Sequence, residues 1–390
     1  MHTAAYLSDF RIARPRFEKS QQDALSWLAG AHAAAEVFAG RPSGREDLTP
    51  EFFQKLLTRF GCPPDRISFR GHELADFQHT DWNKMDVFRL HEQPTGLAME
   101  VRQRLFDQLT RAKCEELYSA GESLSPDLIH VSCTGYVSPS PLQRFAVDRD
   151  HSSKTRVTHA YHMGCYAALP ASRTAAALAL RQLHSSKSPG VGCVDIVHTE
   201  LCTLHFNPLE HSPEQLVVQS LFADGFVRYR ASTDLNKGTS GFRILAMNEV
   251  QIPGSAHAMT WLPVATSMAM TLSREVPTLI AGALKAYVAD LLDEAGCRPQ
   301  DVLPDLVYAV HPGGPKIIDH VQALLEISDE KVQASKNVLR KFGNMSSATL
   351  PHVWQEILDD AQTYPDGTKV LSLAFGPGLT IAGGLFEVVR

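Results

Sequence analysis

The feature that most constrains the fold is a helix-to-strand pattern that occurs twice in the chain. Residues 107–135 read as a helix, an Ala-Gly stop, a short polar link and an apolar strand that ends in a Thr-Gly turn. Residues 285–314 repeat this order, and Pro126-Asp127-Leu128 is answered by Pro304-Asp305-Leu306 at an offset of 178 residues. Two modules in one register predict an internal duplication.

A second pair of segments extends this repeat. Gly164-Cys165 is matched by Gly343-Asn344 at an offset of 179 residues, and a predicted helix follows each pair. The polar, glycine-containing stretch at 232–242 lies between the modules and places the join there. We therefore predict two closely packed halves, residues 1–236 and 237–390. Strands alternate with helices in both, which predicts an α/β fold with helix-covered sheets.

Composition narrows the class of protein. The chain has 390 residues, of which 44% are hydrophobic, so it is long enough for large cores. A net charge of -6 without a Lys/Arg-rich run disfavours nucleic acid as a partner. No stretch approaches 18 uncharged apolar residues, which disfavours a membrane span. The seven cysteines are scattered and include no C-x-x-C pair, so we expect reduced thiols in a cytoplasm. The 17 histidines show no spacing that is typical of metal ligands.

Cys165 precedes a predicted buried helix. Small apolar residues recur at spacings of three and four, at Ala168, Ala171, Ala175 and Leu178. Pro170 is tolerated only in a first turn, so the regular helix begins near Leu169 or is distorted there. Cys165 then lies at or just before the helix N-terminus, which favours a reactive thiolate. The alternative is that it packs as a small hydrophobic residue, as free cysteines usually do.

The duplicated register predicts that four polar side chains converge. Cys133 and His311 each follow an apolar strand, while Cys165 and Asn344 each precede a helix. Cysteine, histidine and asparagine can supply a nucleophile, a proton acceptor and a neutral donor to an oxyanion. Considered on its own, a histidine that follows an apolar strand is often structural. Asparagine is likewise common at helix N-caps without any catalytic purpose.

Five motifs occur in an order and spacing that cover nearly the whole chain. They are Gly164-Cys165-Tyr166-Ala167, LFADG at 221–225, HPGGPKIIDHV at 311–321, FGNMSSAT at 342–349 and AFGPGLT at 374–380. In these motifs the chain resembles the chalcone-synthase-type, type III polyketide synthases of the thiolase superfamily. The resemblance implies a thiolase-like, five-layered α/β/α/β/α fold made from two duplicated halves. It also implies a cytoplasmic homodimer with no permanently bound cofactor and no metal.

The resemblance also implies residue roles. Cys165 matches the acyl-carrying nucleophile, and His311 and Asn344 match the pair that holds the thioester carbonyl and steers malonyl decarboxylation. In this mechanism a Cys165 thiolate is stabilised by a His311 imidazolium. The implied enzyme is an acyltransferase that condenses malonyl-CoA units with a starter from acyl-CoA or an acyl carrier protein. Its products would be secondary metabolites of the pyrone or resorcinol type.

The resemblance extends to a substrate cavity. Its predicted lining residues are Cys133, Cys202, His205, Phe222, Met270, Ser346 and Gly376. Phe222 matches a gatekeeping aromatic residue, and Gly376 belongs to a loop that matches the cavity wall. Met270 stands where plant chalcone synthases have a second gatekeeping phenylalanine. Because methionine is unbranched and adaptable, we expect an aliphatic or irregular starter chain rather than a rigid aromatic one.

Other functions remain open at the level of sequence. The segment at 56–71 is a poor match to the family's coenzyme A phosphate site, so Arg59, Arg66 and Arg70 are candidates to replace it, or a carrier protein delivers the substrate. A β-ketoacyl synthase of the third type would share the fold but perform a single condensation or join two chains. A papain-like thiol hydrolase also orders its residues Cys, His, Asn. A non-catalytic thiolase-fold scaffold is the last alternative.

Overall fold

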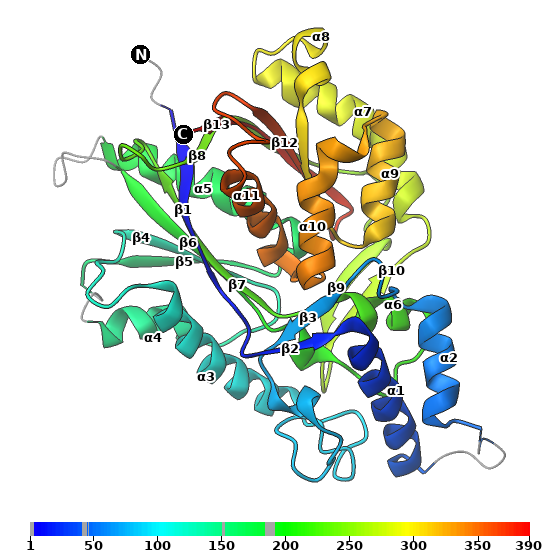
Figure 1. Cartoon of the computed structure of the whole chain (residues 1–390). Coiled ribbons are helices and arrows are strands. Elements are labelled where there is room, and N and C mark those ends of the chain that lie inside the picture. Colours follow the sequence, from blue (N-terminus) through cyan, green and yellow to red (C-terminus); the bar gives the residue numbers. More distant parts are fainter. Residues whose placement is uncertain (1–3, 41–44, 46, 150–152, 184–191) are drawn as a thin grey trace.

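The computed structural model describes residues 4–40, 45, 47–149, 153–183 and 192–390 (Figure 1). Its centre is a sheet that has nine strands within these ranges. In sheet order they are β11 (Val307–Val310), β12 (Lys369–Gly376), β13 (Thr380–Val389), β8 (Gly241–Gln251), β1 (Tyr6–Ala13), β7 (Gly225–Ser232), β6 (Cys193–Glu200), β4 (Asp127–Ser132) and β5 (Arg156–Tyr161). The N-terminal strand β1 joins the two parts of the sheet, because it pairs with both β7 and β8.

The same strand pairing occurs on both sides of this junction. In the first part β4 is parallel to β6, and β6, β7 and β1 are antiparallel neighbours. In the second part β11 is parallel to β12, and β12, β13 and β8 are antiparallel neighbours. The first part adds only β5, parallel to β4, at its outer edge. This repetition supports the division at residues 236 and 237, which stays a prediction.

Two buried helices form the middle layer. They are α5 (Ala168–Leu183) and α11 (Thr349–Asp359). One apolar core includes Ala175 of α5, Trp354 of α11, Val227 of β7 and Ala374 of β12, so these helices pack against both parts of the sheet. The alanine-rich face predicted for α5 is therefore buried, since small side chains let a helix approach its neighbours closely.

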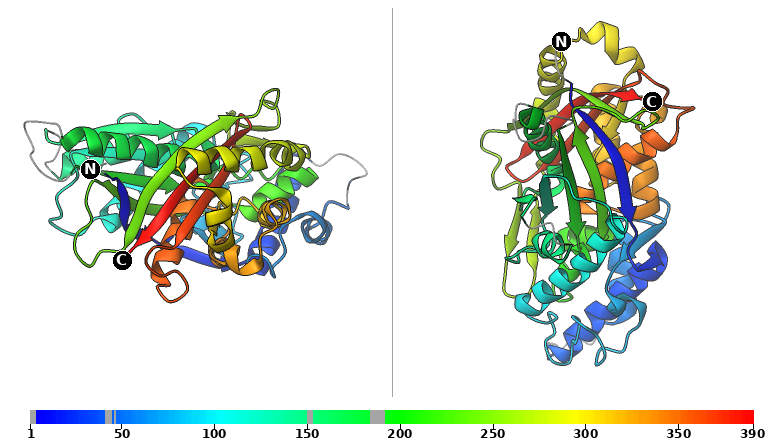
Figure 2. Two further views of the ribbon diagram at one scale, coloured as in Figure 1. Left: turned by 90° about the horizontal axis from the view of Figure 1, so that it is seen from above. Right: turned by 90° about the vertical axis from the view of Figure 1, so that its left-hand side faces the viewer.

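The outer layers consist of helices on the two remaining faces (Figure 2). They are α3 (Met99–Leu117) and α4 (Pro141–Asp148) on the first part, and α7 (Val276–Glu294) and α9 (Pro315–Leu325) on the second. Leu117 and Phe145 share a core with Leu128 of β4. Leu284 and Ile318 share another with Leu371 of β12. The thiolase-like α/β/α/β/α arrangement predicted from the resemblance is confirmed.

Further elements lie around these layers, at both the upper and the lower end in the view of Figure 1. They are β2 (Phe17–Ser20), α1 (Gln21–Phe38), α2 (Pro50–Phe60), β3 (Phe69–His72), α6 (Pro213–Leu221), β9 (Met259–Pro263), β10 (Met268–Leu272), α8 (Pro299–Val302) and α10 (Gln333–Phe342). Strands β9 and β10 form a separate antiparallel hairpin. None of the helices in the described part of the chain is long and apolar enough to cross a membrane.

Candidate active site

Cys165 lies in a short 3-10 turn, Gly164–Tyr166 (η2), directly ahead of α5. Gly164 has a φ of 78°, a left-handed conformation that favours glycine, and a Cβ there would lie 2.7 Å from Pro377. Pro170 falls in the first turn of α5, as predicted. Burial raises the pKa of the Cys165 thiol to about 12, although hydrogen bonds with the Ser346 and Asn344 side chains oppose this shift. Desolvation therefore acts against the thiolate expected at this helix start, which stays a prediction.

His311 directly follows β11 and is anchored by its backbone, whose N–H donates to Leu373 O at 2.7 Å. The residue is only 2% exposed, and neither ring nitrogen has a hydrogen-bond partner among the described residues. Burial lowers the pKa of the His311 ring to about 3, which acts against the predicted imidazolium. A buried polar group without a partner costs about 1–3 kcal/mol, and such a group in a native fold calls for a functional explanation.

The amide of Asn344 has a fixed orientation. Its Oδ1 accepts from Ser346 N at 2.9 Å, and its Nδ2 donates to Gly313 O at 3.2 Å. The Asn344 side chain also hydrogen-bonds with the Cys165 thiol and so opposes the rise in the pKa of that thiol. Gly313 also adjoins His311, because a Cβ on Gly313 would lie 3.5 Å from His311 Cδ2. Through Gly313, the fold thus connects the two residues that sequence analysis paired.

The structure corrects the predicted equivalence of Cys165 and Asn344. Pro170 and Pro351 occupy the same place in the first turns of α5 and α11. In that register Cys165 corresponds to Ser346, the first residue of the 3-10 turn η6 (Ser346–Ala348). The sequence offset was two residues too short, because the connections before the two helices differ in length. The other equivalence is confirmed, since Cys133 and His311 directly follow β4 and β11.

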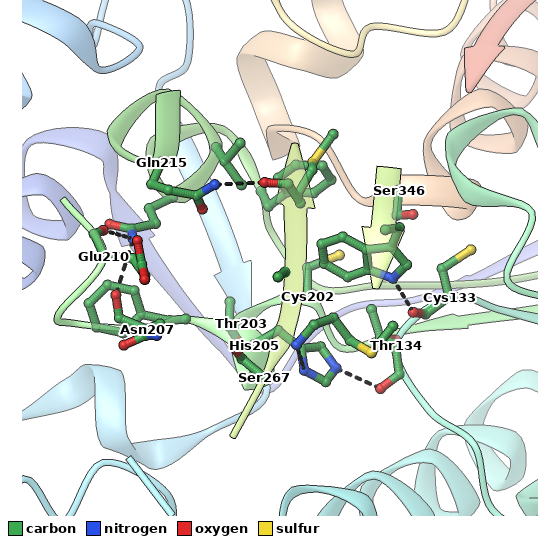
Figure 3. A pocket seen from close by; sticks show the side chains of 18 of the residues that line it. Cys133, Thr134, Cys202, Thr203, His205, Asn207, Glu210, Gln215, Ser267 and Ser346 are labelled. Atoms are coloured by element: carbon green, nitrogen blue, oxygen red, sulfur yellow. Dashed lines mark hydrogen bonds between the residues drawn. The ribbon is translucent and has the colours of Figure 1, made fainter. Parts of the chain in front are cut away.

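A cavity of about 470 Å³ opens beside Cys165 (Figure 3). Of the predicted residues it is lined by Cys133, Cys165, Cys202, His205, Phe222, Met270 and Ser346. Cys133 and Ser346 lie at one end, and Asn207, Glu210 and Gln215 at the other (Figure 3). His311 and Asn344 are buried, at 2% and 1% exposure, and they are not among the residues that line this cavity.

Gly376 does not line this cavity, so that prediction is wrong. A Cβ on Gly376 would lie 2.2 Å from the ring of Tyr166, which shows that the backbone packs directly against that ring. The neighbouring Pro377 forms the wall instead. The glycine therefore serves close packing between β12 and the turn that carries Cys165.

Cys133 belongs to a buried network at the thiol end of the cavity. Its Sγ accepts from Gly164 N at 3.0 Å, and its own N–H donates to the Glu200 carboxylate at 3.0 and 3.2 Å. Thr134 Oγ1 donates to the same carboxylate at 2.9 Å, and Ser347 Oγ donates as well. Burial still raises the pKa of Glu200 to about 7. Glu200 therefore links β4 and β6 to the second half of the chain.

His205 is fixed in one tautomer. Its Nδ1 accepts from Met268 N at 3.2 Å, so the hydrogen is on Nε2, which donates to Thr134 O at 2.7 Å. Burial lowers its pKa to about 3. Both nitrogens are engaged, so His205 shapes the cavity and does not exchange protons there.

Apart from Met270, which was predicted, the β9–β10 hairpin is the part of the site that sequence reasoning missed. It contributes several lining residues, including Trp261, whose Nε1 donates to Cys133 O at 2.7 Å. The signal in the sequence is two short apolar runs separated by VATS, which is typical of a hairpin. Nothing local to the hairpin indicates that it covers residues 128 positions earlier in the chain.

Of the three arginines considered for phosphate binding, Arg70 is buried and lines the cavity. It is 7% exposed, and it donates to Gln21 Oε1, Gln219 O and Phe222 O at 2.7 to 2.9 Å. It therefore supports the wall behind Phe222. Arg66 lies 3.6 Å from Asp319 near the surface, and Arg59 stacks on Phe60. In the described ranges, no group of three or more His, Cys, Asp and Glu residues could hold a metal ion.

Comparisons with known proteins show what the whole chain is similar to. The family model of the C-terminal domain of chalcone and stilbene synthases matches residues 244–390. The alpha-pyrone synthesis polyketide synthase-like Pks18 of Mycobacterium tuberculosis is 27% identical over 100% of this chain and 92% of its own length. Probable polyketide synthase 1 of Dictyostelium discoideum is 30% identical over 57% of this chain, which spans only 7% of that relative. The solved PKS-I of the brown alga Ectocarpus siliculosus has a TM-score of 0.80 at 20% identity, with 100% of both chains covered.

The likeness to the solved structure shows the thiolase-like fold. The family model over residues 244–390 and the full-length similarity to Pks18 support a type III polyketide synthase, and the type III polyketide synthases to which the chain is similar are acyltransferases. The comparisons do not favour a single-condensation β-ketoacyl synthase. The thiolase-like fold contradicts the papain-like alternative.

Proposed function

We propose that the chain condenses malonyl thioester units, with loss of CO2, onto an acyl starter held on Cys165, and that the product closes to a pyrone- or resorcinol-type ring. The observation that carries this proposal is the buried His311, whose ring nitrogens have no partner among the described residues. The Asn344 amide donates to the backbone of Gly313, which adjoins His311, and it also hydrogen-bonds with the Cys165 thiol. Both are neutral donors of the kind that stabilise an enolate oxygen.

Loading of the starter begins from a neutral pair, because burial raises the pKa of Cys165 and lowers that of His311. The Sγ–H proton passes to His311 as Sγ attacks the thioester carbonyl. The tetrahedral intermediate collapses with cleavage of the bond to the coenzyme A sulfur, and the imidazolium returns the proton to that leaving thiolate. The acyl group remains on Cys165.

Condensation then needs a carbanion. Cleavage of the bond between the malonyl α-carbon and its carboxylate releases CO2 and leaves the electron pair as an enolate. Hydrogen bonds from His311 and Asn344 to the enolate oxygen stabilise this charge in a site from which water is largely excluded. The α-carbon attacks the acyl carbon, and the bond to Cys165 Sγ breaks. Such donors contribute roughly 3 kcal/mol each.

The cavity wall supports an aliphatic starter. Phe222 and the half-buried Met270 face the same cavity from different elements, and methionine adapts to irregular chains. We propose malonyl-CoA as the extender and an acyl-CoA or carrier-protein thioester as the starter. The outer edge of β5 pairs with no strand in the described part of the chain, which supports a homodimer formed along this edge. We place the enzyme in the cytoplasm.

The test is incubation with labelled malonyl-CoA and a panel of linear and aromatic acyl thioesters. Mass spectrometry then follows the products and the peptide that contains Cys165. We expect acylation of that peptide, release of labelled CO2 and products with more than one malonyl-derived unit. Cys165→Ala is the control and should give none of these. Single-unit products from every starter would contradict the proposal, as would hydrolysis without malonyl dependence.

A further inference from the structure

Arg70 is a buried cation in the wall of the cavity. It is only 7% exposed. Burial lowers the pKa of its guanidinium to about 10, which leaves the group charged at neutral pH. Among the described residues, no carboxylate forms an ion pair with it. Because a buried charge without a partner is costly, this arrangement calls for an anion from outside the chain.

One nitrogen of the guanidinium is free to bind such an anion. Nε donates to Gln21 Oε1 at 2.7 Å, and Nη1 donates to Gln219 O and Phe222 O at 2.8 and 2.9 Å. Nη2 has no partner in the described ranges, yet it is not sealed off as the ring nitrogens of His311 are. Since Arg70 lines the cavity, a ligand there can reach Nη2.

Two carboxylates in this part of the fold do not neutralise Arg70. Asp224 accepts from Glu73 N, Thr203 N and Thr203 Oγ1 at 2.8 to 2.9 Å, and burial raises its pKa to about 7, so it is only partly ionised at neutral pH. Glu210 lines the cavity but is exposed, so water screens its charge. The desolvated guanidinium therefore dominates the local preference for the charge of a ligand.

Arg70 lies towards the end of the cavity that is remote from the nucleophile. Gln219 O accepts from Arg70 Nη1, and Gln219 Nε2 donates to Glu210 O at 2.7 Å. Glu210 belongs to the end opposite to Cys133 (Figure 3). A chain held on Cys165 therefore presents its distal end to Arg70.

We infer that Arg70 Nη2 binds a carboxylate at the distal end of the starter, so that the preferred starters are half-thioesters of linear dicarboxylic acids. This inference rests on the proposed function. The malonyl carboxylate of the extender is a poor candidate for the same contact, because a guanidinium that held it would oppose its conversion to neutral CO2. A carboxylate at the distal end of the starter keeps its charge through every condensation.

The first experiment uses the wild-type enzyme and paired starters that differ in charge. Each linear dicarboxylic half-thioester, from glutaryl- to sebacoyl-CoA, is compared with its methyl ester in the presence of labelled malonyl-CoA. We expect kcat/KM to favour the carboxylate roughly tenfold or more at the best chain length, as for a charge-assisted hydrogen bond. The preference should peak at one length, because Arg70 is fixed by its bonds to Gln21, Gln219 and Phe222.

The second experiment changes the side chain. Arg70→Met removes the charge and should abolish the preference, while the methyl esters are still used. Arg70→Lys keeps a charge without the planar fork and should retain a reduced preference. Arg298→Met is the matched control and should keep the wild-type preference, since the Arg298 side chain is 74% exposed and does not line the cavity.

Acylation of Cys165 and thermal unfolding report whether each variant is loaded and folded. A folded and loaded Arg70→Met variant with an undiminished preference would overturn the inference. Equal use of carboxylate and ester by the wild type at every length, or a preference that does not depend on length, would overturn it while the proposed function stands. If Arg70→Met does not fold, the wild-type comparison and Arg70→Lys decide the question. If the wild-type enzyme condenses malonyl units onto no starter at all, the proposed function fails instead.

Discussion

The two helix starts at the cavity, η2 with α5 and η6 with α11, share a backbone design but differ in chemistry. Each has a short 3-10 turn, a proline in the first helical turn and a residue that lines the cavity. In the first half that residue is Cys165, and in the second it is Ser346. The comparison teaches that duplication supplies equivalent positions, while the side chain decides which of them can carry an acyl group.

The two strand ends carry Cys133 in the first half and His311 in the second, and they differ in whether their polar atoms have partners. Cys133 is fully engaged, with Gly164 N on its sulfur and Glu200 on its amide. His311 has no partner for its ring, although it is equally buried among the described residues. Of two equivalent positions, the one whose polar atoms are left free is the one available to a substrate.

The largest effect should come from the nucleophile. Cys165→Ala should abolish acyl loading while the fold is retained, because alanine preserves helix propensity and removes the thiol. Ser346→Ala should retain loading, since a hydroxyl at the equivalent position only donates a hydrogen bond. Mass spectrometry of the Cys165 peptide distinguishes them. Equal loss of loading in both variants would break the comparison between the helix starts.

The second-largest effect on activity should come from the residues that directly follow the two strands. His311→Ala should lower condensation by roughly 100- to 1,000-fold, as expected for the loss of an oxyanion donor, and Asn344→Ala should behave similarly. Cys133→Ala should lose far less activity, because its sulfur is occupied by Gly164 N. Single-turnover rates of CO2 release measure the difference. A Cys133 variant as slow as the His311 variant would refute the argument from unpaired atoms.

The carboxylate that joins the two halves predicts a pH dependence of stability. Burial raises the folded-state pKa of Glu200 from 4.5 to about 7, so the folded protein retains a proton that the unfolded chain has released. The free energy of unfolding should therefore fall by about 3 kcal/mol as pH rises from about 4.5 to about 7.

Glu200→Gln removes this titration and should flatten the profile of melting temperature against pH. Part of the slope should remain, because burial also raises the pKa of Asp224 to about 7. Chemical denaturation at several pH values provides an independent measurement. An unchanged slope in the variant would show that Glu200 stays ionised in the fold.

The smallest effect concerns the two gatekeeping positions, Phe222 and Met270. Met270→Phe should shift the preference towards shorter starters by several-fold, because an aromatic ring fills and stiffens that wall. Relative rates on short and long acyl thioesters, measured beside a thermal melt, provide the test. A loss of about 1–3 kcal/mol in stability with unchanged rate ratios would assign Met270 to packing rather than selection.

Much of the architecture could be predicted because it depends on local patterns. Helix and strand periodicities establish the two modules, and Pro170 limits where α5 can begin, which places Cys165 ahead of it. The motifs around His311 and Asn344 were sufficient to identify these two residues as the other candidate catalytic residues. The sequence paired Cys165 with Asn344 in place of Ser346, because it poorly determines the lengths of the connections before the two helices. Pro170 and Pro351 reveal the correct register once both helices are known.

What the sequence determined by itself is therefore the order of elements, the duplicated modules and the identity of the reactive side chains. Only the tertiary structure decided their state and surroundings. It left the His311 ring unpaired among the described residues, raised the pKa of Cys165 by burial, engaged Arg70 with backbone carbonyls and placed Trp261 against Cys133. The physical reason is that desolvation and wall contacts depend on segments far apart in the chain, which no local periodicity encodes.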